Sequence, residues 1–211
     1  MTHRGPATRG PGAAHEQQRH NILEAVFTLV DTQGTQQVSI RNVAKAADVS
    51  VGRVQHYFPT KDALLSAAFA AVNEAGTQGV HQRLAAQGIA DSEATAVAVL
   101  TELIPRDEDR RRLFRVARAF EVYALTRPEL GRRLTQDYEA LIALIAGLLH
   151  RDAAASVTSG SEEALDSARE LIALATGLAG MVLTDNIDPD RAGHLLADRA
   201  HQVFAARDDR G

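Results

Sequence analysis

The chain has 211 residues, of which 45% are hydrophobic and 4% aromatic, with 27 acidic side chains against 23 Lys and Arg. This fits one substantial domain or two small ones, with a core of Leu, Ala and Val that favours helices over strands. The absence of Cys excludes disulfides, Cys-based zinc sites and Cys nucleophiles. No apolar run reaches the roughly 18 residues that span a bilayer, and the N-terminus has no apolar core of a secretory signal, so we expect a cytoplasmic protein without a membrane partner.

Charge is distributed unevenly along the chain. Residues 1–70 carry seven Lys and Arg against five Asp and Glu, whereas residues 71–211 carry 16 against 22. A mildly basic N-terminal part on an acidic body agrees with DNA contact at one end, although charge alone would not suggest it.

The first 15 residues are rich in Gly, Pro, Arg and Ala and lack periodicity, so we expect them to be disordered in isolation. Arg4 and Arg9 would allow this segment to act as a basic arm on DNA, and a solvated tail is the simpler interpretation. From 16 to about 33, apolar residues recur at helical spacing and predict a helix that ends at Gly34.

Residues 39–61 predict two short helices joined by a tight turn. Helical periodicity breaks after Asp48, and Ser50 restarts it as an N-cap. A helix-turn-helix needs a small residue where its helices cross and apolar residues that hold their angle, and Ala44 and Val54 meet both needs. The second helix would turn a polar and aromatic set outward, as expected of a surface that meets DNA: Val51, Arg53, Gln55, His56 and Tyr57.

Lys61 opens the next helix, directly after the predicted N-cap Thr60. A cation in the first helical turn opposes the helix dipole by some tenths of a kcal/mol. A DNA phosphate would bind both the ammonium and the free N–H groups of that turn, so the position suggests a function. An exposed Lys without a role is the alternative.

The run Val-Gly-Arg-Val-Gln-His-Tyr-Phe-Pro-Thr-Lys-Asp-Ala-Leu-Leu, residues 51–65, resembles the DNA-binding signature of the TetR family of transcriptional repressors. The specific similarity covers about residues 19–70. Asp48 replaces a Gly in the turn of the family pattern, and Asp tolerates a left-handed backbone better than most residues, so the turn can survive. Gln55 replaces a common Tyr, so no operator sequence carries over. The resemblance implies the same phosphate contact at Lys61. We expect DNA contacts from Ser39, Arg41, Ser50, Val51, Gly52, Arg53, Gln55, His56, Tyr57 and Lys61.

The remainder predicts helices with short connections, which makes the chain all-α with about nine helices. The later helices are expected at about 91–104, 108–126, 128–150, 162–185 and 189–207. The charge run from Arg106 to Arg112 is interpreted as a solvated helix start. We therefore expect a helix-turn-helix DNA-binding domain at 16–65 and a helical effector-binding and dimerisation domain at 66–207.

The segment 171–183 is apolar on every side, and a helix without a polar face must be covered all round. A core would cover one side and a partner subunit the other, with a purely monomeric core as the alternative. In the resembled family the last two helices form the dimer interface. We therefore assign homodimer contacts to Leu171, Leu174, Leu178, Met181, Leu195, Leu196 and Val203.

The resemblance also implies a pocket for a small-molecule effector among the middle helices. Its candidate lining is Phe114, Arg115, Phe120, Glu121, Tyr123, Tyr138 and Thr176. At helical spacing, Phe120 and Tyr123 are more often plain core.

The expected function is that of a homodimeric repressor, which binds a palindromic operator on double-stranded DNA and is released by an effector. The alternative is an activator, or a helix-turn-helix protein that acts through protein contacts without an effector. The sequence lacks His-Glu-x-x-His, Gly-x-Ser-x-Gly and a phosphate-binding Gly-rich loop, so we expect no enzyme, no cofactor and no metal site.

Overall fold

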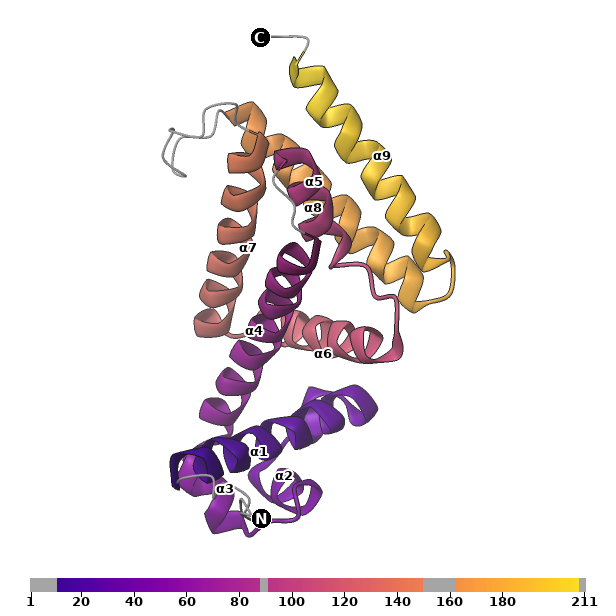
Figure 1. Ribbon diagram of the computed structural model, residues 1–211. Helices are drawn as coiled ribbons and strands as arrows, with labels where there is room; N and C mark the ends of the chain where they lie inside the picture. Colours follow the sequence, from indigo (N-terminus) through magenta and orange to yellow (C-terminus); the bar gives the residue numbers. More distant parts are fainter. Residues whose placement is uncertain (1–10, 88–90, 150–161, 209–211) are drawn as a thin grey trace, which may run out of the picture. The chain divides into compact units, whose positions relative to one another are not determined.

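The computed structural model describes residues 11–87, 91–149 and 162–208, and these residues form helices joined by short connections, without strands. The prediction of an all-α fold is confirmed (Figure 1). The elements are α1 (Pro11–Gln33), the 3-10 turn η1 (Thr35–Gln37), α2 (Ile40–Ala46), α3 (Val51–Tyr57), α4 (Lys61–Gln87), α5 (Ser92–Thr101), α6 (Glu108–Ala124), α7 (Pro128–Leu149), α8 (Glu162–Leu183) and α9 (Pro189–Asp208).

The chain divides into two compact units, Met1–Ala71 and Val72–Gly211, so the boundary falls inside α4 and later than the expected position after residue 65. The first helix also differs from its prediction. α1 begins at Pro11, so residues 11–15 are helical and not part of a disordered arm. Arg4 and Arg9, like the loop predicted at 152–161, lie outside the described residues.

The first unit is held together by apolar side chains from α1 to α4. Ile22, Val43, Val54 and Leu64 are fully buried, and α2 packs against both α1 and α3. Each such side chain contributes about 1.5–3 kcal/mol of burial free energy. This core fixes the angle between the two short helices α2 and α3.

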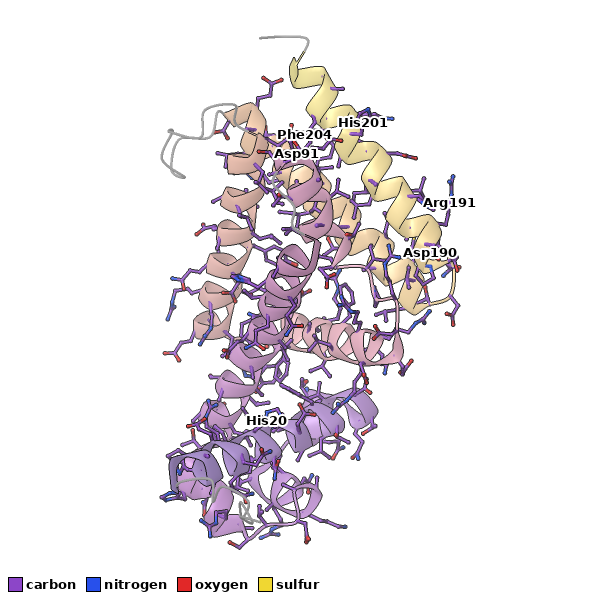
Figure 2. The ribbon with its side chains drawn as sticks, in the orientation of Figure 1. His20, Asp91, Asp190, Arg191, His201 and Phe204 are labelled. Carbon is purple, nitrogen blue, oxygen red and sulfur yellow. The ribbon has the colours of Figure 1, made fainter. Side chains whose placement is uncertain are left out.

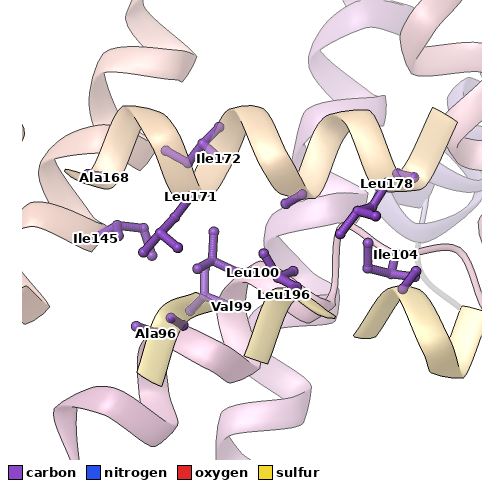
Figure 3. Close-up of a cluster of buried hydrophobic side chains, with 14 of the residues drawn as sticks. Ala96, Val99, Leu100, Ile104, Ile145, Ala168, Leu171, Ile172, Leu178 and Leu196 are labelled. Carbon is purple, nitrogen blue, oxygen red and sulfur yellow. The ribbon is translucent and has the colours of Figure 1, made fainter. Parts of the chain in front are cut away.

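The core of the second unit is built from α5, α7, α8 and α9. Leu100, Ile145, Leu171 and Leu196 are fully buried within it, one from each of these helices (Figure 3). Towards the end of α9, His201 and Phe204 lie near the start of α5 (Figure 2), where the His201 ring contacts the carboxylate of Glu93 at 2.9 Å. Among the described helices, none combines the length and the apolar character needed to cross a membrane.

Two ion pairs join the segment at the start of α6 to the α8–α9 connection and the first turn of α9. Arg106 Nη1 lies 2.7 Å from Asp190 Oδ1, and Arg111 Nη1 lies 3.1 Å from Asp185 Oδ1. The run 106–112 is therefore an exposed helix start, as expected, and two of its arginines also connect segments about 80 residues apart in sequence.

Candidate nucleic-acid interface and ligand site

The turn between α2 and α3 closes without glycine. Asp48 adopts φ 53°, in the left-handed region, and the Val49 amide donates to the Ala44 carbonyl at 2.9 Å. A hydrogen bond that links the first and last of six residues, with a left-handed residue next to its end, is a Schellman motif. The left-handed position of this motif is usually occupied by Gly. The expectation that Asp48 sustains the turn is confirmed.

The predicted N-caps position the three helices that form the candidate interface. Ser39 Oγ accepts from the Asn42 amide, Ser50 Oγ from the Arg53 amide and Thr60 Oγ1 from the Ala63 amide, each at 3.1 Å. Each cap satisfies a backbone donor that the helix itself cannot pair. Lys61 is half-buried and is the first residue of α4, as predicted.

Helix α3 has one buried and one exposed side. Val54 is fully buried and Phe58, just beyond the helix, is buried with it. Val51 is 41% exposed, Tyr57 is half-buried, and the predicted contact residues Gly52, Arg53, Gln55 and His56 are exposed, as are Arg41 and Ser50. Ser39 is half-buried. The arrangement offers DNA a polar and aromatic helix face, and the individual contacts stay a prediction.

His15 on α1 also belongs to this surface, although no pattern in the sequence singles it out. Its ring lies 4.6 Å from the Tyr57 ring and 6.2 Å from the His56 ring, between centroids. His15 therefore braces the C-terminal turn of α3 from a helix far away in sequence. The sequence signal for the helix that carries it is the Pro at position 11, which is well suited to the first turn of a helix.

Three of the predicted effector residues have structural partners of their own. Phe120 is fully buried in the protein. Tyr123 is buried beneath Arg127, whose Cζ lies 3.5 Å from the ring centroid. Arg115 pairs with Glu108 on the same helix at 2.9 Å. These contacts explain the three residues as part of the fold.

The other four surround Arg118 of α6, which the sequence did not single out. Its Nη1 lies 2.6 Å from Glu121 Oε2, its Nη2 donates to the Thr176 carbonyl at 3.1 Å, and its Cζ lies 5.2 Å from the centroid of the Phe114 ring. Tyr138 of α7 donates its hydroxyl to Glu121 Oε1 at 3.4 Å. We refer to Phe114, Arg118, Glu121, Tyr138 and the Thr176 carbonyl as the Arg118 cluster.

The Arg118 cluster is partly removed from water, since the side chain of Arg118 is 38% exposed and that of Glu121 is 25% exposed. Burial raises the pKa of Tyr138 above its usual value, Glu121 adds to the rise, and Arg118 opposes it. Because the Arg118 guanidinium pairs with the Glu121 carboxylate and a phenol is neutral at pH 7, the cluster as a whole carries no net charge.

The predicted dimer residues fall into two groups. Leu171, Leu178 and Leu196 belong to the buried core of the second unit, so the assignment of these three to a partner contact is wrong: their own subunit already covers them. Leu174, Leu195 and Val203 are half-buried and pack against the same core, whereas Met181 is 45% exposed.

The outward face of α8 instead carries two small residues and a methionine. Ala173, Gly177 and Met181 are exposed and follow one another at helical spacing along this face. A Cβ added at Gly177 would have nothing within 4 Å. Small residues on one helix allow another helix to approach closely.

A capped helix-turn-helix with an exposed polar helix, joined to a second helical unit with its own core, defines a DNA-binding transcriptional regulator. Residues 22–68 match the family described as bacterial regulatory proteins of the tetR family, and residues 92–205 match the BetI-type transcriptional repressor, C-terminal. The chain belongs to the TetR family of transcriptional regulators.

Similar proteins agree with this assignment over most of the chain. The HTH-type transcriptional regulator PksA of Bacillus subtilis is 26% identical over 90% of this chain and 91% of its own length. A transcriptional regulator from Rhodococcus sp. Rha1 has a TM-score of 0.76 at 26% identity, covering 89% of this chain and 96% of that one. A transcriptional regulator from Saccharomonospora viridis in complex with choline shares the fold, with a TM-score of 0.72 at 21% identity over 87% of this chain and 95% of that one.

Proposed function

We propose that this regulator is a homodimeric repressor that binds a palindromic operator and releases it when a small molecule binds the second unit. The observation that carries the proposal is the exposed face of α3, where Arg53, Gln55 and His56 stand on a helix whose opposite side is buried through Val54. Such a helix is suited to the major groove, where side chains read base edges.

The side chains of the interface suit two different kinds of DNA contact, to bases and to phosphates. Arg53 and Gln55 carry the donors and acceptors that distinguish base pairs. Lys61 and the amides of the first turn of α4 suit a phosphate, because the helix N-terminus and the ammonium both favour an anion. Base contacts specify the sequence and phosphate contacts position the protein on it.

Sequence-specific DNA binding by α3 requires a dimer. The seven residues of α3 span too short a length to read more than a few base pairs. A two-fold dimer places two such helices about one helical turn of DNA apart and requires a palindromic site. We place the dimer contact on the outward face of α8, at Ala173, Gly177 and Met181.

The Arg118 cluster is the proposed effector site. It joins side chains of α6 and α7 to the backbone of α8, so a molecule that contacts it would favour one arrangement of these helices over another. An effector that binds better to the arrangement with low operator affinity would release the DNA by a population shift. Catalysis is not part of the proposal.

The test begins with the DNA that the protein itself selects from fragmented genomic DNA. On the selected duplex and a scrambled one, fluorescence anisotropy compares R53A and Q55A with K61A. R53A and Q55A should cost about 1–3 kcal/mol on the selected duplex and little on the scrambled one. K61A should weaken both and reduce the slope of log K against log salt by about 1.

R132A is the matched control, because it removes a cation from an exposed position on α7, outside the proposed dimer contact, and should leave DNA affinity unchanged. Equal losses on both duplexes for all three interface variants would contradict the division into base and phosphate contacts. If no genomic DNA is retained, a helix-turn-helix that acts through protein contacts becomes the better account. A reporter gene behind the selected site then separates repression from activation.

A further inference from the structure

The Arg118 cluster contains the two groups with which proteins bind organic cations. An aromatic ring offers the negative face of its quadrupole, and a carboxylate offers a counter-charge. Here the ring is Phe114 and the carboxylate is Glu121. Both already hold a cation, because the Arg118 guanidinium lies 5.2 Å from the ring centroid and 2.6 Å from the carboxylate.

Arg118 is anchored more firmly than an ordinary surface ion pair. Besides Glu121 and Phe114, it bonds to the Thr176 carbonyl on another helix at 3.1 Å. The carboxylate also accepts a hydrogen bond from the Tyr138 hydroxyl, at 3.4 Å. The guanidinium is thus fixed by groups from two helices, within a cluster whose charges cancel.

We propose that Arg118 is a tethered cation that fills the cluster's own cation-binding position. The inference rests on the proposed function, in which this cluster is the effector site. It follows that the effector is a net-neutral molecule that presents a carboxylate or carbonyl oxygen to Arg118, and not a free quaternary ammonium ion.

The reason is the charge balance of a partly buried site. A free cation would have to displace Arg118 from Glu121 and leave the guanidinium unpaired at 38% exposure, which is costly when water cannot fully replace the lost partner. A zwitterion leaves neither charge unpaired. Its carboxylate bonds to Arg118, which has five N–H donors, and its cationic end faces Glu121 Oε1, whose bond from Tyr138 is long at 3.4 Å.

Choline and glycine betaine are suitable probes because both are small quaternary ammonium compounds, and glycine betaine carries a carboxylate where choline carries a hydroxymethyl group. Isothermal titration calorimetry with the full chain measures their binding to the wild type and four variants. R118M and R118Q remove the cation, R118K keeps it, and R169M removes a cation elsewhere on the second unit.

We expect choline to bind R118M and R118Q at least about tenfold more tightly than the wild type, because the ring and the carboxylate become free. R118K and R169M should behave as the wild type does, and adding E121Q to R118M should abolish the gain. Any affinity for glycine betaine should fall in R118M and R118Q.

Two results would overturn the inference. One is a wild type that binds choline more tightly than glycine betaine, with R118M leaving that order and the choline affinity unchanged. The other is an R118M and R118Q pair that melts as cooperatively as the wild type yet binds choline no better. Anisotropy on the selected operator is measured separately, so absent DNA binding would refute the regulatory proposal while the ligand result still decides the role of Arg118.

Discussion

Replacing Gly177 by Ala distinguishes a solvated face of α8 from one packed against a partner. Gly177 lies in the interior of α8, is exposed, and a Cβ there would meet nothing within 4 Å in the isolated chain. In an exposed helix interior, Ala is more favourable than Gly by about 0.8–1.0 kcal/mol. For a chain of this size, that gain raises the melting temperature by about 2–4 °C.

The sign reverses if α8 packs against its symmetry mate. The added Cβ atoms then enter a close helix contact, where overpacking typically costs about 1–3 kcal/mol. The dimer dissociation constant would rise about 5- to 150-fold. The same substitution stabilises the subunit and weakens the dimer. The two effects can be measured separately, because only the second depends on protein concentration.

Sedimentation velocity over a dilution series measures the dissociation constant, and thermal melts at the lowest concentration measure the subunit. G76A is the matched control, since Gly76 is an exposed residue inside α4 with equally open space around it. It should stabilise the protein without changing the dissociation constant. If G177A dimerises as tightly as the wild type and stabilises it as G76A does, the outward face of α8 is not the dimer contact.

Three further predictions concern single contacts. Urea denaturation should find D48A about 1 kcal/mol less stable than the wild type and D48G at least as stable, because the left-handed region penalises a Cβ, Asp tolerates that region better than Ala, and Gly has no Cβ; equal stability of all three would contradict that conformation. H15A should weaken operator binding about 2- to 10-fold by removing the ring contacts with Tyr57 and His56, and H15F should retain most of the affinity; an unchanged affinity in H15A would show that the brace is unimportant. Absorbance titration should find the pKa of the Tyr138 phenol above its usual value. The unfolded chain then loses this proton first, so stability falls as pH rises above about 10, and Y138F should lack that part of the fall; identical alkaline profiles would count against the burial of this hydroxyl.

The features predicted correctly from the sequence are those fixed by neighbouring residues. An N-cap joins a side chain to an amide three residues later. The helix starts after Ser39, Ser50 and Thr60 can therefore be predicted from neighbouring residues alone. Asp48 is similar, because the left-handed position is set by the ends of two adjacent helices. The buried and exposed sides of α3 follow from the same local spacing.

The features that escaped prediction depend on contacts distant in sequence. Arg118 looks like any charged residue on an amphipathic helix, and its role arises only where Tyr138 of α7 and the Thr176 carbonyl of α8 meet it. His15 was assigned to a disordered arm because its partners, His56 and Tyr57, lie on another helix. Composition around these residues carried no signal of either contact.

The dimer assignment failed for Leu171, Leu178 and Leu196, which their own subunit buries, while Met181 stays in the proposed contact. A helix that is apolar on every side shows that two sides are covered, but not which side faces the core. Side-chain size does not decide this in α8, because Ala168, Ala175 and Ala179 are buried beside Leu171 and Leu178, whereas the large Met181 is exposed with Ala173 and Gly177. The neighbouring helices decide it: α7 and α9 pack on the side of α8 that carries Leu171 and Leu178, so the side of Gly177 and Met181 stays exposed in the single chain. The expected partner contact moves to that side once the packing of α7 and α9 is known.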